Sequence, residues 1–271
     1  MNIAVTGASG FIGGHLCASL GAAGHEVHPC SARGGVDRLE LGAAEVLVHL
    51  AAFAHARGVD PAKLRRVNTD LPLELGRLCA ARGIRMVFMS SVKVHGGESA
   101  APLTEAAPFA PADEYGESKA RAEEGLRAIP GLRLTVLRPP LVYGPGVRAN
   151  FLALVRAIAR GWPLPLASID NRRSLVFVGN LADAVARVLA TDGTFFVSDG
   201  EPVSTPRLCE EIGAALGRPA RLFPFPSALL PRKLAGSLVV DDSALRRALG
   251  WRAPHSLETG LAQTARWYRR R

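Results

Sequence analysis

The stretch TGASGFIG, residues 6–13, stands between a short apolar run at the N-terminus and an apolar-periodic segment that reaches Ala23. This order predicts a strand, a glycine turn and a helix. The three glycines, Gly7, Gly10 and Gly13, would let the backbone approach a diphosphate at the positive N-terminal end of that helix. The stretch therefore predicts a dinucleotide-binding turn directly after the first strand.

Strand-like and helix-like segments alternate beyond this turn. Apolar runs that indicate strands lie at residues 27–30, 46–50, 86–90, 133–137 and 175–178, and helical patterns lie at 64–81, 115–128 and 180–190. Such alternation predicts an α/β fold with a Rossmann-type doubly wound parallel sheet. Helices would cover both faces of the sheet, and ligands would bind at the carboxyl ends of its strands.

The pattern changes after about residue 192, where prolines separate short helical patterns at 205–216 and 257–268. This change predicts a smaller C-terminal substrate-binding lobe. We expect residues 1–149 and 171–192 to form the dinucleotide-binding domain, and residues 150–170 and 193–271 to form the lobe.

The composition excludes several classes of protein. Of the 271 residues 48% are apolar, and 33 Lys and Arg against 24 Asp and Glu give a net charge of +9, which excludes a disordered or fibrous chain. The basic residues are scattered, so nucleic acid is not expected as a partner. No apolar run approaches a membrane span and no signal region opens the chain, which predicts a soluble, cytoplasmic protein. The four cysteines form no C-x-x-C pair, so no metal site is expected.

The end of the second predicted strand bears on the choice of cofactor. NAD-dependent proteins place a carboxylate there for the adenosine ribose 2′-hydroxyl, whereas this chain has Ser31 and Arg33. A hydroxyl and a guanidinium suit a 2′-phosphate, so we favour NADP(H), with NAD(H) as the alternative. The short segment between Arg33 and Val46 leaves room only for a rudimentary further strand beside the adenine.

Tyr115 and Lys119, in the stretch YGESK, are four residues apart, which places a phenol and an ammonium on one helix face. A nearby cation favours phenolate and would draw the tyrosine pKa from about 10 towards the working range of an acid or base. Ser91 ends a predicted strand upstream, at the sheet edge where the cofactor should lie. The three residues together predict a hydroxyl, a proton donor and a cation beside a nicotinamide.

These residues resemble those of the extended short-chain dehydrogenase/reductase superfamily, in its nucleotide-sugar epimerase, dehydratase and reductase branch. The resemblance rests on TGASGFIG at 6–13, HLAA at 49–52, NT at 68–69, SS at 90–91, YGESK at 115–119, RPPLVYG at 138–144 and LADA at 181–184. It implies that Ser91 is the catalytic serine, Tyr115 the acid or base, and Lys119 the partner that also holds the nicotinamide ribose. Asn68 would brace this arrangement or else cap a helix N-terminus.

The same motifs imply a set of cofactor contacts at several strand ends. They are Gly7, Gly10, Phe11, Ile12, Gly13, Ser31, Arg33, Leu50, Ala51, Ala52, Asn68, Tyr115, Lys119 and Pro139. Phe11 and Ile12 also fit a purely structural role in the core.

Within the branch, residues 90–94, 139–151 and 171–178 look most like reductases of UDP-4-keto-6-deoxy-N-acetylhexosamines. Such enzymes make UDP-QuiNAc or UDP-FucNAc for bacterial polysaccharides. Dehydratases of the branch carry Thr-Asp-Glu where this chain has Ser91-Val92-Lys93, which argues against 4,6-dehydration because no acid remains to assist elimination.

The resemblance also implies contacts to the UDP-sugar. Ser91 would bind the reacting oxygen, and Asn150 and Arg173 match positions that contact the diphosphate. Lys93 and Arg148 are weaker candidates for the phosphates.

Two alternatives to the reductase stay open. A UDP-sugar 4-epimerase of the UDP-glucose or UDP-GlcNAc type would use the same residues and keep NAD tightly bound. Two departures weaken it: an asparagine that such epimerases place on the diphosphate aligns with Leu141, and GSLVVD at 236–241 replaces their arginine-rich segment. The short segment 34–45 leaves room for the second alternative, a catalytically silent nucleotide-binding scaffold. We further expect a homodimer, with the helix around Tyr115 in its interface.

Two further features are interpreted without a catalytic role. Glu123 and Glu124 fit a solvated helix terminus better than a catalytic carboxylate pair. His95 follows the serine strand, where it would either touch the cofactor pocket or cap a turn.

Overall fold

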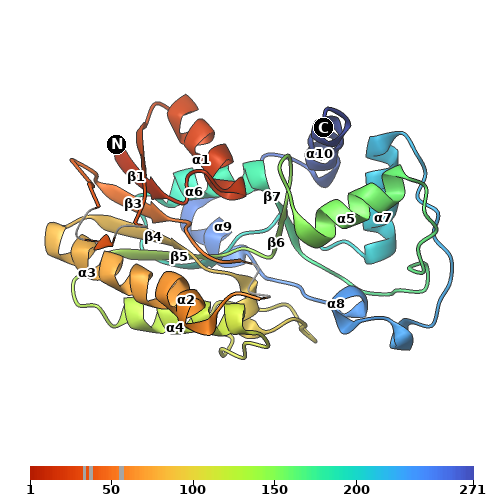
Figure 1. Ribbon diagram of the computed structural model, residues 1–271, viewed down its shortest axis with the longest axis horizontal. Coiled ribbons are helices and arrows are strands. Elements are labelled where there is room, and N and C mark those ends of the chain that lie inside the picture. The colour runs from red at the N-terminus through yellow and green to blue at the C-terminus, as the bar shows by residue number, and fades with distance from the viewer. Residues whose placement is uncertain (33–34, 37–38, 55–57) are drawn as a thin grey trace.

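A six-stranded parallel sheet forms the centre of the larger lobe in the computed structural model, which describes residues 1–32, 35–36, 39–54 and 58–271 (Figure 1). The expected cofactor contact Arg33 lies outside the described residues. The strands run in the order β2-β1-β3-β4-β5-β8, with bounds β1 Asn2–Thr6, β2 Glu26–Cys30, β3 Val46–His49, β4 Arg85–Met89, β5 Leu134–Arg138 and β8 Gly193–Phe196. The doubly wound parallel sheet predicted from the alternation is confirmed.

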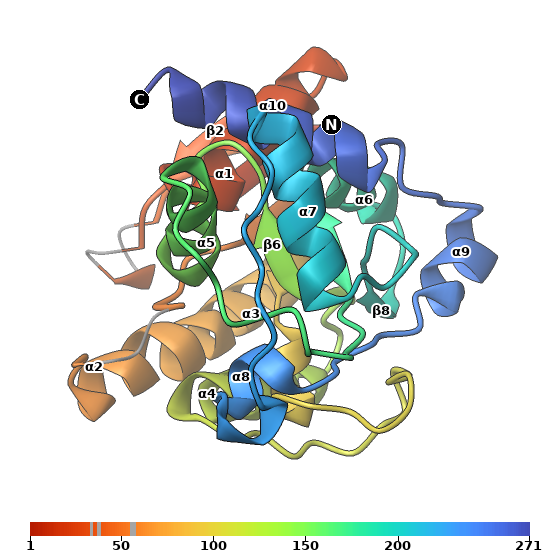
Figure 2. The same ribbon diagram turned by 90° about the vertical axis from the view of Figure 1, so that its right-hand side faces the viewer.

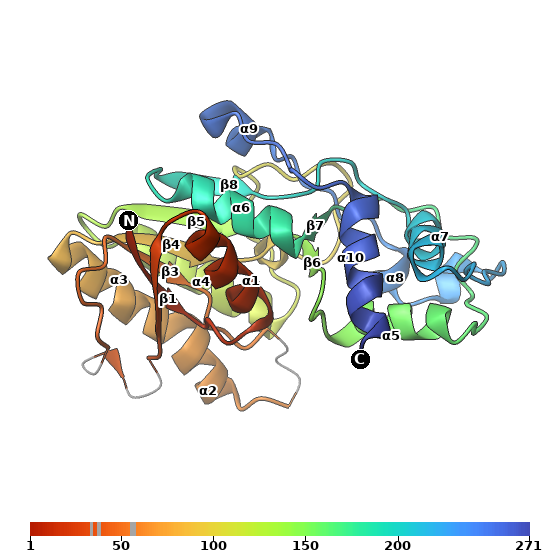
Figure 3. The same cartoon turned by 90° about the horizontal axis from the view of Figure 1, so that it is seen from above.

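Helices cover both faces of this sheet. On one face lie α1 (Phe11–Ala22) and α6 (Val178–Val188), which contact each other; on the other lie α3 (Leu71–Arg82) and α4 (Glu114–Arg127) (Figures 1 and 3). A short helix, α2 (Pro61–Arg65), and a π-helical turn at Arg66–Asp70 lead into α3.

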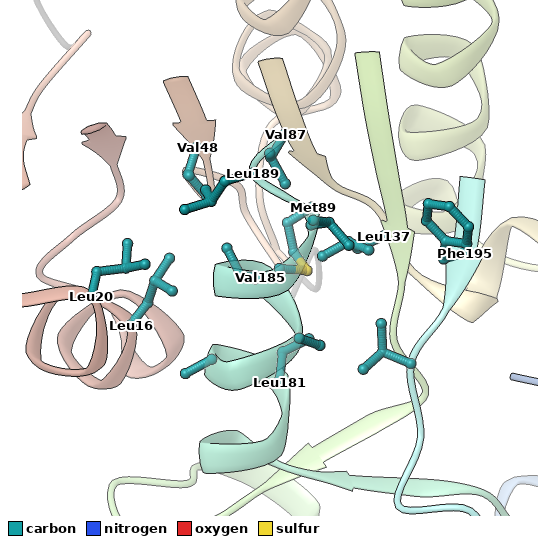
Figure 4. Close-up of a cluster of buried hydrophobic side chains, with 14 of the residues drawn as sticks. Leu16, Leu20, Val48, Val87, Met89, Leu137, Leu181, Val185, Leu189 and Phe195 are labelled. Atoms are coloured by element: carbon teal, nitrogen blue, oxygen red, sulfur yellow. The ribbon is translucent and has the colours of Figure 1, made fainter. Parts of the chain in front are cut away.

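The strand periodicity explains the two apolar layers. Val46 and Val48 of β3 point to the side of α1 and α6, whereas Leu47 points to the side of α3 and α4, because successive strand residues face opposite sides. Figure 4 shows the first layer, in which Val185 of α6 packs among Leu16 of α1 and the strand side chains. Both faces of each central strand are therefore buried, as expected for a parallel sheet.

The smaller lobe has its own sheet and apolar cluster. Its two parallel strands are β6 (Leu141–Tyr143) and β7 (Leu175–Phe177). Around them pack α5 (Ala149–Ala159), α7 (Thr205–Leu216) and α10 (Leu257–Arg269), as Figure 2 shows. The short helix α8 (Arg232–Ala235) lies in this lobe, whereas α9 (Ser243–Leu249) contacts β8 and places Leu245 in the apolar cluster of the larger lobe.

Three strands lie in the other sheet from the one expected, and the first is β6, whose residues 141–143 were expected in the dinucleotide-binding domain. Residues 193–196, expected in the substrate-binding lobe, form β8 and close the large sheet beside β5. The run at 175–177, expected in the dinucleotide-binding domain, forms β7 and pairs with β6. All three are short apolar segments, and short length and hydrophobicity do not specify which partner strand they join.

The order of the strands reverses at β1, which has β2 on one side and β3 on the other. Among residues 31–32, 35–36 and 39–45 the structure contains no strand, so β2 is an edge strand and the expected further strand is missing from the described part. In open α/β sheets the crevice at such a reversal is the ligand site. The ends of β1 and β3 therefore define where a cofactor would bind.

Within the described residues, no helix combines the length and the apolar character that a membrane span requires.

Candidate active site

The glycine turn brings two strand ends into close contact. Gly7 has φ +72°, and a Cβ atom there would lie 2.7 Å from the backbone nitrogen of Ala51, directly after β3. Gly10 is the N-cap of α1, and no side chain of the described residues caps this helix. The first-turn N–H groups are thus left for an external acceptor, and the tight backbone leaves space above it. This arrangement fits the diphosphate of a dinucleotide.

Gly13→Ala is expected to raise the dissociation constant of the cofactor by at least about 10-fold. This corresponds to a loss of roughly 1.4 kcal/mol of binding free energy, caused by displacement of the glycine turn. A Cβ atom at Gly13 would collide with the carbonyl oxygen of Gly7 and lie 2.7 Å from the Cα atom of Ala8, so the turn must move. Isothermal titration with NADPH and NADH measures the dissociation constants.

The matched control is Gly14→Ala, one residue further along α1. A Cβ atom there meets no described atom within 4 Å, so helix propensity alone predicts a stabilisation of up to about 1 kcal/mol with unchanged cofactor affinity. Equal affinities of the two variants would contradict the close contact at Gly13.

The remaining predicted cofactor contacts surround this crevice. Leu50, Ala51 and Ala52 follow β3, Ser31 follows β2, and Pro139 follows β5, where its carbonyl accepts from the Val92 N–H at 3.0 Å. Phe11 and Ile12 pack against the apolar cluster of the smaller lobe, and Phe11 also lines the open pocket beside Gly10.

The structure brings Ser91, Tyr115 and Lys119 together. The Asp113 carboxylate caps α4 by accepting from the Gly116 N–H at 2.9 Å, which fixes the start of the helix. The Ser91 hydroxyl, two residues after the end of β4, is hydrogen-bonded to the Tyr115 phenol. One turn further along α4, the Nζ atom of Lys119 donates to the Met89 carbonyl at 2.8 Å.

The protonation of Tyr115 differs from the expectation. Burial raises the pKa of its phenol to about 12, and the hydrogen bond with Ser91 offsets only part of this effect. Burial also lowers the pKa of Lys119 to about 7, which the Glu123 carboxylate partly opposes. The expected lowering of the tyrosine pKa is therefore wrong, because desolvation outweighs the hydrogen bond with Ser91 and the Asp113 carboxylate adds to the rise. The phenol is held in its protonated form, as a proton donor requires.

Asn68 braces the loop after β3 against α4. It lies buried in the π-helical turn, where its side chain accepts from the Phe53 N–H at 2.8 Å and donates to the Ser118 hydroxyl at 3.1 Å. The alternative role as a helix N-cap is wrong, because Asn68 lies in the third position of that turn.

Glu123, interpreted from sequence as solvated, is fully buried on α4, one turn beyond Lys119. Its carboxylate accepts from Arg138 at 2.7 Å, from Arg127 at 2.6 Å and from the Ser90 hydroxyl. The spacing of four residues from Lys119 is the signal that could have placed Glu123 on the inner face of α4.

His95 belongs to the same buried network. Its Nε2 atom lies 2.9 Å from Nη1 of Arg138, and its Nδ1 atom lies 2.9 Å from the Pro108 carbonyl. Neither of the two roles considered for His95, in the cofactor pocket or at a turn cap, describes these contacts.

The four predicted phosphate contacts lie in different places. Lys93 forms an ion pair with Asp113 at 2.6 Å, beside Tyr115. Arg148 and Asn150 lie exposed at the N-terminus of α5. Arg148 lines an open pocket of about 350 Å³ together with Gly10 and His15. Arg173 lies just before β7 and donates to the Gly236 carbonyl at 2.8 Å.

No cluster of three or more His, Cys, Asp or Glu side chains that could hold a metal ion occurs in the described part of the chain.

Comparison with known proteins gives consistent matches. The family model described as "NAD dependent epimerase/dehydratase family" matches residues 3–196. A UDP-glucose 4-epimerase of Vibrio cholerae is 34% identical, covering 97% of this chain and 94% of its own, and a dTDP-4-dehydrorhamnose reductase of Mycobacterium tuberculosis is 29% identical over 97% and 93%. The structure of a Thermus thermophilus UDP-glucose 4-epimerase in complex with NAD has a TM-score of 0.81 and 26% identity, and the match covers 99% of both chains.

Proposed function

The chain belongs to the NAD dependent epimerase/dehydratase family, and we propose that it reduces the C4 ketone of a UDP-4-keto-6-deoxy-N-acetylhexosamine, of the UDP-QuiNAc or UDP-FucNAc type. Its relatives are named as nucleotide-sugar 4-epimerases and sugar reductases, which supports an NAD(P)-dependent nucleotide-sugar enzyme in general. The reductase assignment depends on the site.

The observation that carries the enzymatic part of the proposal is the hydrogen bond between Ser91 and Tyr115, and the choice of the reductase over the 4-epimerase rests on Leu141 and on the segment 236–241. Bound NAD(P)H would supply the hydride to C4, and the glycine turn would hold its diphosphate. Ser91 hydrogen-bonds the carbonyl oxygen of the sugar, and Tyr115 gives its proton to the alkoxide that forms. Lys119 supplies the positive charge that stabilises the phenolate left behind.

Residues around the site argue against the other reactions of the family. Lys93 stands where dehydratases carry an acid, so no carboxylate assists elimination there. Leu141, which aligns with the diphosphate-binding asparagine of 4-epimerases, exposes an apolar side chain that cannot hydrogen-bond a phosphate.

A UDP-sugar 4-epimerase is the second candidate, and the Vibrio cholerae relative favours it. It would use the same three residues but return the hydride to the substrate, so the two candidates differ in net consumption of cofactor. For the reductase we favour NADP(H), because β2 ends before Ser31 without a carboxylate for the ribose 2′-hydroxyl.

The test measures absorbance at about 340 nm, where reduced nicotinamides absorb. Purified protein receives NADPH or NADH together with UDP-4-keto-6-deoxy-GlcNAc generated in place by a dehydratase. Stoichiometric loss of absorbance is expected, faster with NADPH. No loss, together with interconversion of UDP-GlcNAc and UDP-GalNAc or of UDP-glucose and UDP-galactose, would replace the reductase by the epimerase.

A further inference from the structure

A lysine and an aspartate form an ion pair against the proposed proton donor. The Nζ atom of Lys93 lies 2.6 Å from the Oδ2 atom of Asp113 and 5.5 Å from the centre of the Tyr115 ring, over its face. The Lys93 side chain is 43% exposed and that of Asp113 36%, and Tyr115 is itself partly buried. The pair thus borders the site without being part of the buried core.

The pair joins the segments that carry the serine and the tyrosine. Lys93 lies in the 3-10 turn Val92–His95, and its backbone N–H donates to the Ser91 hydroxyl at 3.3 Å. Asp113 is the N-cap of α4, two residues before Tyr115. A Cβ atom at Gly116 would lie 2.5 Å from the Lys93 carbonyl oxygen, so the turn and the helix are in close contact.

The two members of the pair act on Tyr115 in opposite directions. The Asp113 carboxylate adds to the effect of burial and raises the pKa of the phenol. A cation over the ring attracts its π face and favours the phenolate. The charged and titratable groups that face Tyr115 are Lys93 from the 3-10 turn, Asp113 from the start of α4, and the Ser91 hydroxyl after β4. Lys119 lies one turn further along α4, where its ammonium donates to the Met89 carbonyl.

We propose that Lys93 is a positioning residue that holds the Ser91 segment to the start of α4 and neutralises Asp113, so that Tyr115 can both release and regain its proton. Lys93 then serves the proton donor and not the phosphates of the substrate. The inference rests on the proposed function, because it takes Tyr115 as the acid of the reaction.

The test compares Lys93→Gln, Asp113→Asn and the double variant. Asparagine caps helices as well as aspartate, so Asp113→Asn keeps the start of α4 and removes only the charge. The chain has three tyrosines, so protein carrying tyrosine labelled with ¹³C at Cζ gives few resonances, and the one missing from Tyr115→Phe is that of Tyr115. The titration is carried out with whichever of NAD⁺ and NADP⁺ binds more tightly. The positive charge of the oxidised nicotinamide lowers the pKa of the phenol and so brings it into the pH range that the titration covers.

Lys93→Gln is expected to raise the pKa of Tyr115 by about one pH unit, the lower end of what a neighbouring charge produces. Asp113→Asn is expected to lower it, and the double variant to lie near the wild type. Unchanged titration in all three variants would overturn the proposal. If Lys93→Gln instead raises the dissociation constant for UDP 10-fold or more and leaves the pKa of Tyr115 unchanged, Lys93 binds the phosphates of the substrate and the proposal is wrong.

The titration needs no sugar substrate, so it separates this inference from the function. A shifted pKa in a protein that does not turn over the keto sugar would retain the role of Lys93 and reject the reductase. Turnover of the keto sugar without any change in the Tyr115 pKa would retain the reductase and reject the role of Lys93.

Discussion

Tyr115→Phe is expected to lower kcat by about 10²- to 10⁴-fold, the contribution of a positioned general acid. The variant keeps the ring and removes only the phenol oxygen, which is hydrogen-bonded to Ser91 and lies in a site that burial keeps protonated. Steady-state rates with the keto sugar measure the loss. Cofactor affinity should stay within about twofold, because α1 and the glycine turn are untouched.

Tyr268→Phe is the matched control, since Tyr268 lies on α10 in the smaller lobe and packs against its apolar cluster. It should retain the wild-type kcat. Wild-type turnover by Tyr115→Phe would assign the proton donor to another group.

Glu123→Ala is expected to destabilise the folded chain by about 3–5 kcal/mol, the cost of leaving a buried charge without its partner. Arg138 is 2% exposed and donates through two nitrogens to the Glu123 carboxylate, and the rings of Phe109 and Phe196 lie beside its guanidinium. In these apolar surroundings the guanidinium left without the carboxylate keeps most of its desolvation penalty. Urea unfolding followed by circular dichroism measures the free energy of unfolding.

Glu124→Ala, one residue further on the exposed side of α4, is the control and should change the stability by less than about 0.5 kcal/mol. Adding Arg138→Met to Glu123→Ala should recover part of the loss, because the unpaired cation is removed. Equal stabilities of the two alanine variants would show that the buried network contributes nothing.

The same network predicts how stability depends on pH. Burial raises the pKa of Glu123, but the hydrogen bonds and charge of Arg138 outweigh burial and lower the pKa below its usual value. A carboxyl with a lowered pKa stabilises the folded state above its unfolded pKa of about 4.3, and this contribution is lost as the pH falls further. Glu123→Gln should therefore flatten the acid side of the stability profile.

Local patterns in the sequence were sufficient to predict several individual strands and helices in both lobes. The predicted strand at residues 2–6 matches β1, and the predicted helix at 205–216 matches α7, because periodicity and capping residues are local signals. The four-residue spacing of Tyr115 and Lys119 likewise fixed their common face.

Properties that depend on distant partners were not predicted. Glu123 and Arg138 lie on different elements, and nothing in the helical sequence shows that a strand supplies the arginine. The direction of the Tyr115 pKa shift depends on how far burial removes the phenol from water. The four-residue spacing of Tyr115 and Lys119 in the sequence carries no information about that burial. The sheet that β8 joins was equally a matter of tertiary pairing.

The inner face of α4 sets a limit on how this protein can change during evolution. Tyr115, Lys119 and Glu123 repeat every four residues, so one helix face carries both the proposed proton donor and the buried carboxylate that anchors the helix in the core. Inserting or deleting one residue between Tyr115 and Glu123 would turn one group away from the other by about 100°. Substitutions can therefore abolish catalysis and leave a folded chain, whereas length changes are confined to the segments outside this helix.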